Sequence, residues 1–266
     1  LLMDLGRNRV GQFGLAQSGA LDAKSATRAN GLVGNPANTP LLELTLTGGV
    51  WTALRDVVLG FAGYGMIPKV DGESIAPARS FLLRQGQKLE FIPTQNGVRA
   101  YLAIAGGFEA QRFWGSASTD IRAGLGTVLK AGTVLGSAKP KATRAGYALG
   151  QPALAPARVR LLEGAQPDQK TMQALCAQSF ILERSDRMGL QLQGQSDQSL
   201  QGGDVISEAT PLGALQISSS GKVLLLLHDR GRIGGYAKPA LLHPADLWRM
   251  AQLRTGERVH FYTQSK

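Results

Sequence analysis

The chain has 266 residues, of which 43% are hydrophobic and 18% charged, the composition of a globular protein with a sizeable core. Its one cysteine excludes an internal disulfide and a cysteine-based metal site. The net charge of +10 comes from scattered basic residues without interleaved aromatics, which favours an acidic small molecule or acidic partner over nucleic acid. No apolar run is long enough to span a membrane and no signal-peptide pattern is seen, so we expect a cytoplasmic protein.

The first 33 residues predict a structured loop followed by a short helix. Residues 5–22 contain four glycines and match neither a P-loop nor a dinucleotide fingerprint. Asp22 has the position of a helix N-cap, and small apolar residues follow at helical spacing over residues 22–33. A structural role is therefore available to Asp22, and also to Asn30 on the same helix.

From residue 41 the pattern becomes that of β-strands. Leu42, Leu44 and Leu46 alternate with polar residues, and Gly48-Gly49 then turns the chain. Short strands separated by Gly, Asn and Pro predict a barrel or sandwich. The expected strands are 56–62, 66–70, 81–83, 88–92, 99–105, 158–162, 180–183, 190–193, 223–227 and 258–262, with further helices at 167–177 and 244–253.

Two segments without regular patterning separate these strands. The hydroxyl-rich residues 114–120 form either an anion-binding loop or a plain turn. Residues 139–156, rich in Ala, Gly and Pro, are a candidate linker. We therefore expect a mainly β protein in two β-rich halves with a few short helices. The first half is residues 1–145, with the short helix, and the second is residues 146–266.

The stretch 207–238 is the strongest candidate for a site. Five aliphatic residues, 223–227, predict a buried strand that stops at His228-Asp229-Arg230 and the glycines 231, 234 and 235. Polar groups at the end of a rigid strand are a common way to build a site. The alternative is a buried strand followed by an ordinary glycine turn.

The chemistry available is that of amides, carboxylates, guanidinium groups and tyrosine. His228, His243 and His260 are far apart in sequence, and no nucleophile elbow is present. Arg187 could bind a carboxylate bidentately, Gln216 offers an amide donor and acceptor, and Tyr236 could donate to an oxyanion or move a proton. Each also has a structural alternative. Arg187 could form a surface salt bridge, Gln216 could point outward from a strand, and Tyr236 could be a packed aromatic residue.

Short motifs follow one another in order along nearly the whole chain. They are Asp4-Leu-Gly-Arg7, Ser18-Gly-Ala-Leu-Asp22, Ala29-Asn30, Leu32-Val-Gly-Asn-Pro36, Leu42-Glu43, Ala105-Gly-Gly107, Gly115-Ser-Ala-Ser-Thr119, Ser185-Asp-Arg-Met-Gly-Leu190, Ser207-Glu208, Gly213-Ala-Leu-Gln216, Asp229-Arg230, Gly234-Gly-Tyr236 and Ala251-Gln-Leu-Arg-Thr-Gly256. Together they resemble the carboxyltransferase subunit-2 family. This family includes the C subunit of bacterial ATP-dependent 5-oxoprolinase, the antagonist of a sporulation-kinase inhibitor, "allophanate hydrolase subunit 2" and part of the carboxyltransferase module of urea carboxylase. The chain departs from the family pattern at Asn8-Arg9, Ser218-Ser-Ser220 and Gly231-Arg-Ile233.

The resemblance implies cyclophilin-like β-barrels and work with a homologous B subunit, similar to the kinase inhibitor, and with an A subunit. It implies ATP-driven opening of the lactam 5-oxoproline to glutamate, with ATP shared with the partner subunits. Arg187 or Arg230 would hold the substrate carboxylate, Gln216 would bind the lactam, and Asp22 or Tyr236 would handle protons. The implied catalytic residues are Asp22, Tyr236 and Gln216, and the implied substrate-binding residues are Arg7, Asn30, Arg187, Asp229, Arg230, Gly234 and Gly235.

Two rival functions stay open within the same family. A biotin-dependent carboxyltransferase of the allophanate or urea type would need biotin on a partner, since this chain has no Met-Lys biotinylation site. A regulatory protein without chemistry would bind a kinase-inhibitor homologue. The genes adjacent to this one would discriminate between them.

Overall fold

The structure is a computed structural model that describes residues 1–139, 143–154, 157–195, 200 and 202–264. The chain divides into two compact units. Unit 1 comprises Leu1–Arg9 and Ser18–Leu154, and unit 2 comprises Val10–Gln17 and Ala155–Lys266. The expected mainly β fold with a barrel and few short helices is confirmed. The division falls after residue 154, whereas the sequence analysis placed it after residue 145.

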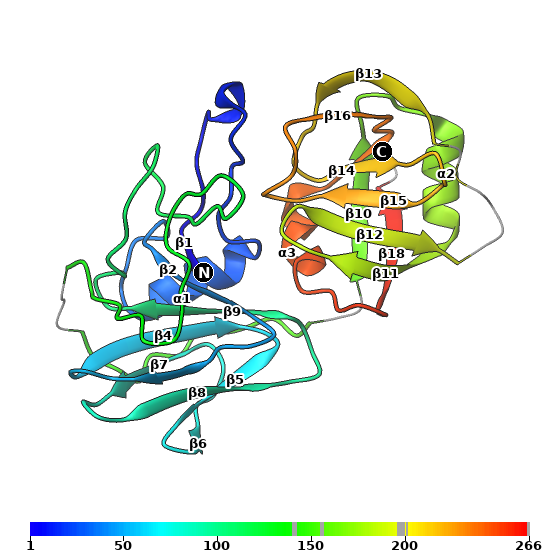
Figure 1. The fold of residues 1–266 in the computed structure, drawn as a ribbon. Coiled ribbons are helices and arrows are strands. Elements are labelled where there is room, and N and C mark those ends of the chain that lie inside the picture. Colours follow the sequence, from blue (N-terminus) through cyan, green and yellow to red (C-terminus); the bar gives the residue numbers. More distant parts are fainter. Residues whose placement is uncertain (140–142, 155–156, 196–199, 201, 265–266) are drawn as a thin grey trace. The chain divides into compact units, whose positions relative to one another are not determined.

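Unit 1 is built from two antiparallel sheets (Figure 1). The larger sheet has the order β1 (Leu2–Met3), β2 (Leu41–Thr45), β9 (Arg99–Ile104), β4 (Val57–Gly63) and β7 (Arg79–Leu83). The smaller one has the order β3 (Val50–Thr52), β8 (Lys88–Pro93), β5 (Met66–Val70) and β6 (Glu73–Ser74).

Strand β9 is buried on both faces because it lies between two apolar clusters. Ala100, Leu102 and Ile104 belong to the cluster that includes residues from both sheets. Tyr101 and Ala103 alternate with them and face the cluster that contains helix α1 (Ala23–Leu32). The larger sheet of unit 1 therefore has one face covered by the second sheet and the other by the helix.

Helix α1 packs closely on β4 because a glycine lies at the contact. A Cβ atom at Gly60 would lie 2.5 Å from the carbonyl oxygen of Ala29 and 3.0 Å from Cβ of Leu32. Both atoms belong to the helix, whose backbone cannot move aside without leaving the sheet. Gly60 therefore sets how closely α1 approaches the strand.

Gly60→Ala is expected to destabilise the protein by about 1–3 kcal/mol, the usual cost of overpacking a tight core. Urea unfolding measures the effect. Gly150→Ala is the matched control, since its Cβ would meet no atom within 4 Å and its φ is not positive. Equal unfolding midpoints for the two variants would contradict the proposed helix contact.

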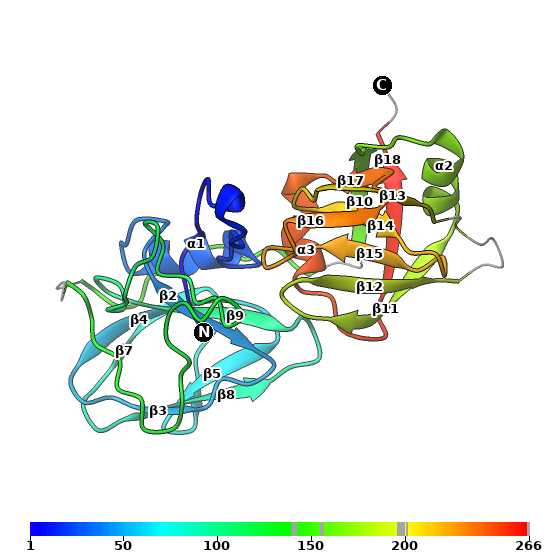
Figure 2. The same ribbon diagram turned by 45° about the horizontal axis from the view of Figure 1, so that its top comes forward.

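Unit 2 is a closed barrel (Figure 2). Around the barrel the strands are β10 (Ala157–Glu163), β17 (Ala240–Leu242), β14 (Ala214–Ile217), β15 (Val223–Leu226), β12 (Gly189–Gly194), β11 (Ser179–Ser185) and β18 (Arg258–Thr263). The parallel pair β10–β18 closes it. Alternating residues such as Val159, Leu192 and Leu225, each fully buried, fill its interior.

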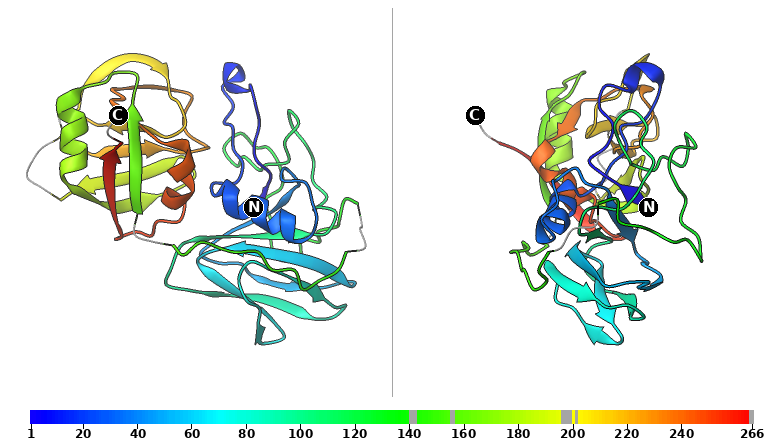
Figure 3. Two further views of the ribbon diagram at one scale, coloured as in Figure 1. Left: turned by 180° about the vertical axis from the view of Figure 1, so that it is seen from behind. Right: turned by 90° about the vertical axis from the view of Figure 1, so that its left-hand side faces the viewer.

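Short helices accompany the barrel. Helix α2 (Gln169–Ala177) lies along the outside of the barrel beside β18 and buries Leu175 (Figure 3). The single helix expected at 244–253 is shorter: a 3-10 turn (Pro244–Asp246) leads into α3 (Leu247–Met250). A second 3-10 turn, Gly11–Phe13, lies in the N-terminal loop. The helices of the described residues are too short and too polar to cross a bilayer.

The glycine-rich segment after β15 contains a strand, which differs from the ordinary glycine turn that was one of the two interpretations of this segment. Ile233–Tyr236 forms β16 and pairs antiparallel with β13 (Asp204–Ala209), a strand that the sequence did not predict. Glycine disfavours strands, but pairing with a partner far away in sequence overrides this local preference. Gly234 and Gly235 therefore lie on a two-stranded ribbon.

The candidate linker at 139–156 is partly bound to unit 1. Ser80 donates its backbone N–H to the carbonyl of Tyr147, and Leu149 donates to Ala78. The side chain of Gln151 both accepts from and donates to the backbone of Gly63. This segment lacks hydrophobic patterning because it is held by hydrogen bonds along a sheet edge, while residues 140–142 and 155–156 lie outside the described residues.

Candidate functional site

The residues predicted for the site fall into both units. Arg7, Asp22 and Asn30 belong to unit 1. Unit 2 contains the remaining seven, which are Arg187, Gln216, Asp229, Arg230, Gly234, Gly235 and Tyr236. Each group is described within its own unit.

Asp22 caps helix α1. Its Oδ1 accepts from the backbone N–H of Ser25 at 3.0 Å and its Oδ2 from the Ser25 hydroxyl at 2.7 Å. Its backbone N–H donates to the hydroxyl of Tyr101 at 2.8 Å. Burial raises the pKa of Tyr101 well above its ordinary value, and the charges of Glu43 and Asp22 act in the same direction. Both carboxylate oxygens of Asp22 thus have a structural use.

Asn30, in the last turn of helix α1, forms hydrogen bonds to the loop that follows the helix. Its Nδ2 donates to the carbonyls of Ala37 at 3.2 Å and Thr39 at 2.9 Å. Its Oδ1 accepts from Asn35, whose amide also reaches the backbone of Ile104 at 2.8 Å. Fully buried and bonded on both sides, Asn30 holds the turn after α1.

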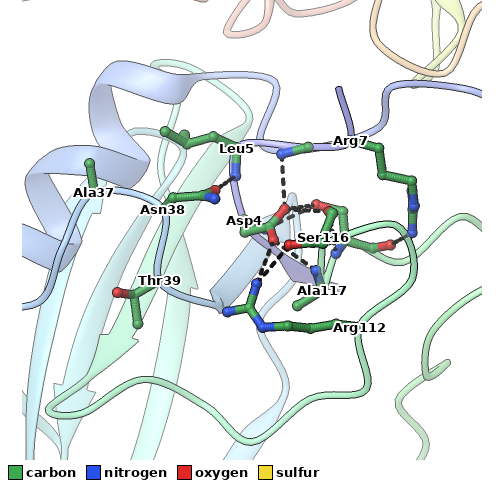
Figure 4. A network of polar contacts seen from close by, with 12 residues as sticks. Asp4, Leu5, Arg7, Ala37, Asn38, Thr39, Arg112, Ser116 and Ala117 are labelled. Atoms are coloured by element: carbon green, nitrogen blue, oxygen red, sulfur yellow. Dashed lines mark hydrogen bonds and ion pairs between the residues drawn. The ribbon is translucent and has the colours of Figure 1, made fainter. Parts of the chain in front are cut away.

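The hydroxyl-rich loop at 114–120 surrounds the carboxylate of Asp4 (Figure 4). Oδ1 of Asp4 accepts from the hydroxyls of Ser116 and Ser118, both at 2.6 Å, and Oδ2 accepts from the backbone N–H of Ala117 at 2.7 Å. Nη1 of Arg112 lies 3.6 Å from Oδ2 of Asp4. The loop therefore satisfies a carboxylate that is 1% exposed.

Arg7 belongs to the same network. Its guanidinium donates to the carbonyl of Ser118, and the residue is 1% exposed. Figure 4 shows its side chain directed toward the loop that holds Asp4. This placement ties the segment after β1 to the loop.

In unit 2, Arg187 and Asp229 form a two-pronged ion pair. Nε of Arg187 lies 2.7 Å from one carboxylate oxygen and Nη2 lies 3.2 Å from the other. The backbone N–H of Asp229 also donates to the carbonyl of Arg187 at 3.0 Å. The pair joins the β11–β12 connection to the segment after β15, so one side of the Arg187 fork is occupied within the chain.

Arg230 has a different environment, since it is 6% exposed and, within the described part of the chain, its side chain donates to backbone carbonyls. Its Nε donates to Thr210 at 2.7 Å and its Nη1 to Leu227 at 3.2 Å. Among the described residues no carboxylate lies within ion-pair distance of it. Burial, reinforced by the charge of Arg232, lowers the pKa of Arg230 to about 10.

Gln216 carries a side-chain amide whose nitrogen is buried. The residue lies on β14, is 6% exposed, and its Nε2 finds no partner among the described residues. Gly234 lies against it, because a Cβ there would be 2.7 Å from this nitrogen and 3.0 Å from the Thr210 methyl group. Strand alternation puts Tyr236 on the same face of β16 as that position. A buried unpaired amide costs about 1–3 kcal/mol unless a ligand completes it.

The sequence analysis did not assign four further residues of this region to the site. They are Gln166, Glu208, Thr210 and Lys238. Thr210 donates its hydroxyl to the carbonyl of Gly231 and its backbone N–H to Arg232. Lys238 is fully buried, with its Nζ 2.9 Å from Glu208 and 3.0 Å from the carbonyl of Tyr236. Hydrogen bonds from Lys238 and Gln166 lower the pKa of Glu208. Recognising 233–236 as a strand would have pointed to Lys238.

Within the part of the chain that the structure describes, the region around Thr210 thus combines an arginine without a carboxylate at ion-pair distance, a side-chain amide nitrogen without a partner and a nearby tyrosine. Such a set suits a ligand that carries both an anionic group and an amide. Within the described ranges no group of three or more His, Cys, Asp or Glu residues could hold a metal ion. We refer to Thr210, Gln216, Arg230, Gly234 and Tyr236 as the ribbon site.

Gly234→Ala is expected to reduce activity about tenfold with little loss of stability. The added methyl group would displace the flexible end of Gln216, and misplacing a reacting or binding group costs rate. Glutamate formation from 5-oxoproline, assayed with the expected partner subunits, measures the first effect, and thermal unfolding of the chain measures the second. Gly203→Ala is the control, since its Cβ meets nothing within 4 Å. A large fall in melting temperature with unchanged activity would contradict this role.

A model of the family described as "Carboxyltransferase domain, subdomain A and B" matches residues 13–263. The chain is 31% identical to the C subunit of 5-oxoprolinase from Escherichia coli (strain K12), over 98% of this chain and 86% of that protein. It is 26% identical to urea amidolyase of Saccharomyces cerevisiae over 95% of this chain and 15% of that protein. The crystal structure of TTHA0988 superposes with a TM-score of 0.95 at 49% identity, covering 98% of this chain and 53% of that one. The chain therefore spans about half the length of this solved relative.

Proposed function

The chain belongs to the carboxyltransferase family of subdomains A and B, and on that basis we propose that it is one component of an ATP-dependent 5-oxoprolinase. The relative named as the C subunit of 5-oxoprolinase matches nearly the whole chain. A protein with such a name has partner subunits, and we propose a homologous B subunit and an A subunit as the partners of this chain. The activity is expected in the complex rather than in the chain alone.

The observation that carries this proposal is the unpartnered amide of Gln216 beside Gly234. 5-Oxoproline presents a ring amide together with a carboxylate. An amide side chain pairs with a lactam through one donor and one acceptor. Arg230 supplies the positive charge for an anionic group, in preference to Arg187, whose fork contacts Asp229. Tyr236 is assigned to proton transfer, since the oxygens of Asp22 cap α1.

We propose that this chain shares the binding of ATP with its partner subunits and contacts at most part of the phosphates. The fit rests on Arg230, a buried cation without a carboxylate partner among the described residues. ATP supplies the phosphoryl group that makes the lactam oxygen a leaving group. The residues of this chain bind and orient the substrate and handle protons at the lactam nitrogen.

The test is glutamate release from 5-oxoproline by purified subunits. We expect glutamate when ATP and all subunits are present, and none when this chain is omitted. A well-formed complex that converts ATP without releasing glutamate would overturn the proposal.

The likeness to urea amidolyase supports a second candidate, a carboxyltransferase that acts with biotin on a partner. The same ribbon site would then bind a urea-type amide through Gln216. The two functions differ in the partner required. Carboxylation of urea that depends on a biotin-carrying partner, with no glutamate formed, would favour the second.

A further inference from the structure

Glu208, on strand β13, has a carboxylate of which one oxygen is bonded within the chain. Its Oε1 accepts from Nε2 of Gln166 at 2.5 Å and lies 2.9 Å from Nζ of Lys238. Its Oε2 accepts no hydrogen bond from the residues that the structure describes, and 40% of the side chain is exposed. Because an ionised carboxylate accepts hydrogen bonds at both oxygens, Oε2 is available to a donor on a ligand.

The groups that hold this carboxylate are themselves fixed. Nζ of Lys238 also donates to the carbonyl of Tyr236 at 3.0 Å, and the backbone N–H of Lys238 donates to Oε1 of Gln166 at 2.9 Å. Lys238 is fully buried, and a buried ammonium group is stable only with its charge compensated. Glu208 therefore has one defined position relative to Tyr236, and hydrogen bonds from Lys238 and Gln166 lower its pKa.

A second glutamate has the same kinds of partner at the surface of the barrel. Oε2 of Glu183 accepts from Nζ of Lys222 at 2.8 Å and from Nε2 of Gln191 at 2.9 Å, and 36% of this side chain is exposed. The side chain of Lys222 is 38% exposed, whereas that of Lys238 is fully buried. The two glutamates thus match in partners and exposure, but only Glu208 is held by a buried lysine.

The register of the ribbon places Glu208 on the face that carries the ribbon site. Glu208 and Gly234 are direct partners in the antiparallel β13–β16 pair. Side chains of directly opposite residues lie on the same face, with Cβ atoms about 4.5–5.5 Å apart. Since a Cβ at Gly234 would be 2.7 Å from Nε2 of Gln216, the Cβ of Glu208 lies within about 8 Å of that nitrogen. This distance leaves room for a small ligand between the two side chains.

We propose that Oε2 of Glu208 accepts a hydrogen bond from the substrate nitrogen as the amide bond breaks, and that its charge stabilises the ammonium group that forms. In the net opening of a lactam by water, the carbon–nitrogen bond breaks and its electron pair stays on the nitrogen. The carbon gains the oxygen of the water and becomes a carboxylate, and the nitrogen gains the two protons. A fixed anion beside the nitrogen favours this change, since the positive charge develops only as the bond breaks. Identifying the substrate as the lactam 5-oxoproline rests on the proposed function.

The first test is calorimetric titration of the full chain with L-glutamate and, separately, with glutarate, which has the same two carboxylates and no amino group. We expect glutamate to bind at least about tenfold more tightly, because a charge-assisted bond joins its ammonium group to Glu208. Glu208→Gln is expected to abolish this preference. Glu183→Gln is the matched control and should keep it, since Glu183 lies on β11 outside the ribbon site.

The second test is glutamate formation from 5-oxoproline, assayed with the expected partner subunits. Glu208→Gln is expected to lower kcat about 10²-fold and to change KM less than about threefold, because the lactam nitrogen is uncharged in the bound substrate. A residue with a purely structural role would not give this separation of kcat from KM. Glu183→Gln should leave both constants unchanged.

Thermal unfolding checks that each variant folds. If Glu208→Gln does not fold, Glu208→Asp decides: it keeps the charge beside Lys238, withdraws the carboxylate by one methylene and is expected to lose the preference for glutamate. A chain that binds glutamate no more tightly than glutarate, or a preference that survives in the Glu208 variant, overturns the ammonium site, while glutamate formation by the complex would still support the proposed function. A preference that the variant abolishes, in a chain whose complex forms no glutamate, supports the site and rejects the proposed function.

Discussion

Gln216→Ala is expected to lower glutamate formation by the assembled complex about 10²- to 10³-fold, the usual effect of removing a donor that the transition state needs. The wild-type amide nitrogen is buried and has no hydrogen-bond partner among the residues that the structure describes, so its removal relieves a cost rather than breaking a contact. The melting temperature should therefore change little. Steady-state kinetics with all subunits present, and calorimetry of the chain alone, measure the two quantities.

Two further variants sharpen this result. Gln191→Ala is the control: this glutamine lies on β12, which β15 separates from β14, and it donates to Glu183 outside the ribbon site. Asp22→Asn keeps the helix cap and removes a carboxylate. Activity retained in Asp22→Asn supports Tyr236 as the proton-handling residue, and activity lost there supports Asp22. Full activity in Gln216→Ala would remove the central residue of the proposal.

Asp4→Ala should destabilise the protein by about 3–5 kcal/mol, because several buried donors lose one acceptor together. Ser116, Ser118 and the backbone of Ala117 all donate to this carboxylate. It also accepts from the N–H of Gly6 at 2.9 Å. Urea unfolding followed by tryptophan fluorescence measures the loss.

Asp56→Ala is the matched control for Asp4→Ala. Its carboxylate accepts one exposed hydrogen bond, from the backbone of Gln85 at 2.8 Å. A change below about 1 kcal/mol is expected there, as for most surface substitutions. If both variants unfold at the same urea concentration, the Asp4 network contributes little to unit 1.

Local patterns predicted the strands that alternate clearly or carry continuous apolar runs. Met66–Val70 was predicted with both its ends, and 223–227 differs from β15 by one residue. Strands β13 and β16 were missed because neither carries such a pattern. β13 is largely exposed, and β16 is half glycine. Their existence depends on pairing between segments distant in sequence, which no local window records.

The candidate site shows the same limit. An arginine in sequence has no visible partner, so Arg187 and Arg230 appeared equivalent as anion binders. Folding gives Arg187 the carboxylate of Asp229 and gives Arg230 backbone carbonyls. Gln216 was assigned by residue chemistry, but its unsatisfied nitrogen is a property of packing. Residue type predicts which chemistry a side chain could perform, whereas the three-dimensional environment decides whether that side chain is already engaged by other groups of the chain.

The assignment of Val10–Gln17 to unit 2, between two segments of unit 1, makes unit 2 discontinuous in sequence. The polypeptide passes from one unit to the other at residues 9–10, 17–18 and 154–155. A fragment that starts at residue 155 would therefore contain every strand of the barrel and lack the segment that contacts Arg232. Domain dissection at this boundary would expose the Arg232 side chain that Gly11 covers, so truncation experiments require residues 10–17 to be supplied, for instance by fusing them through a linker to the fragment.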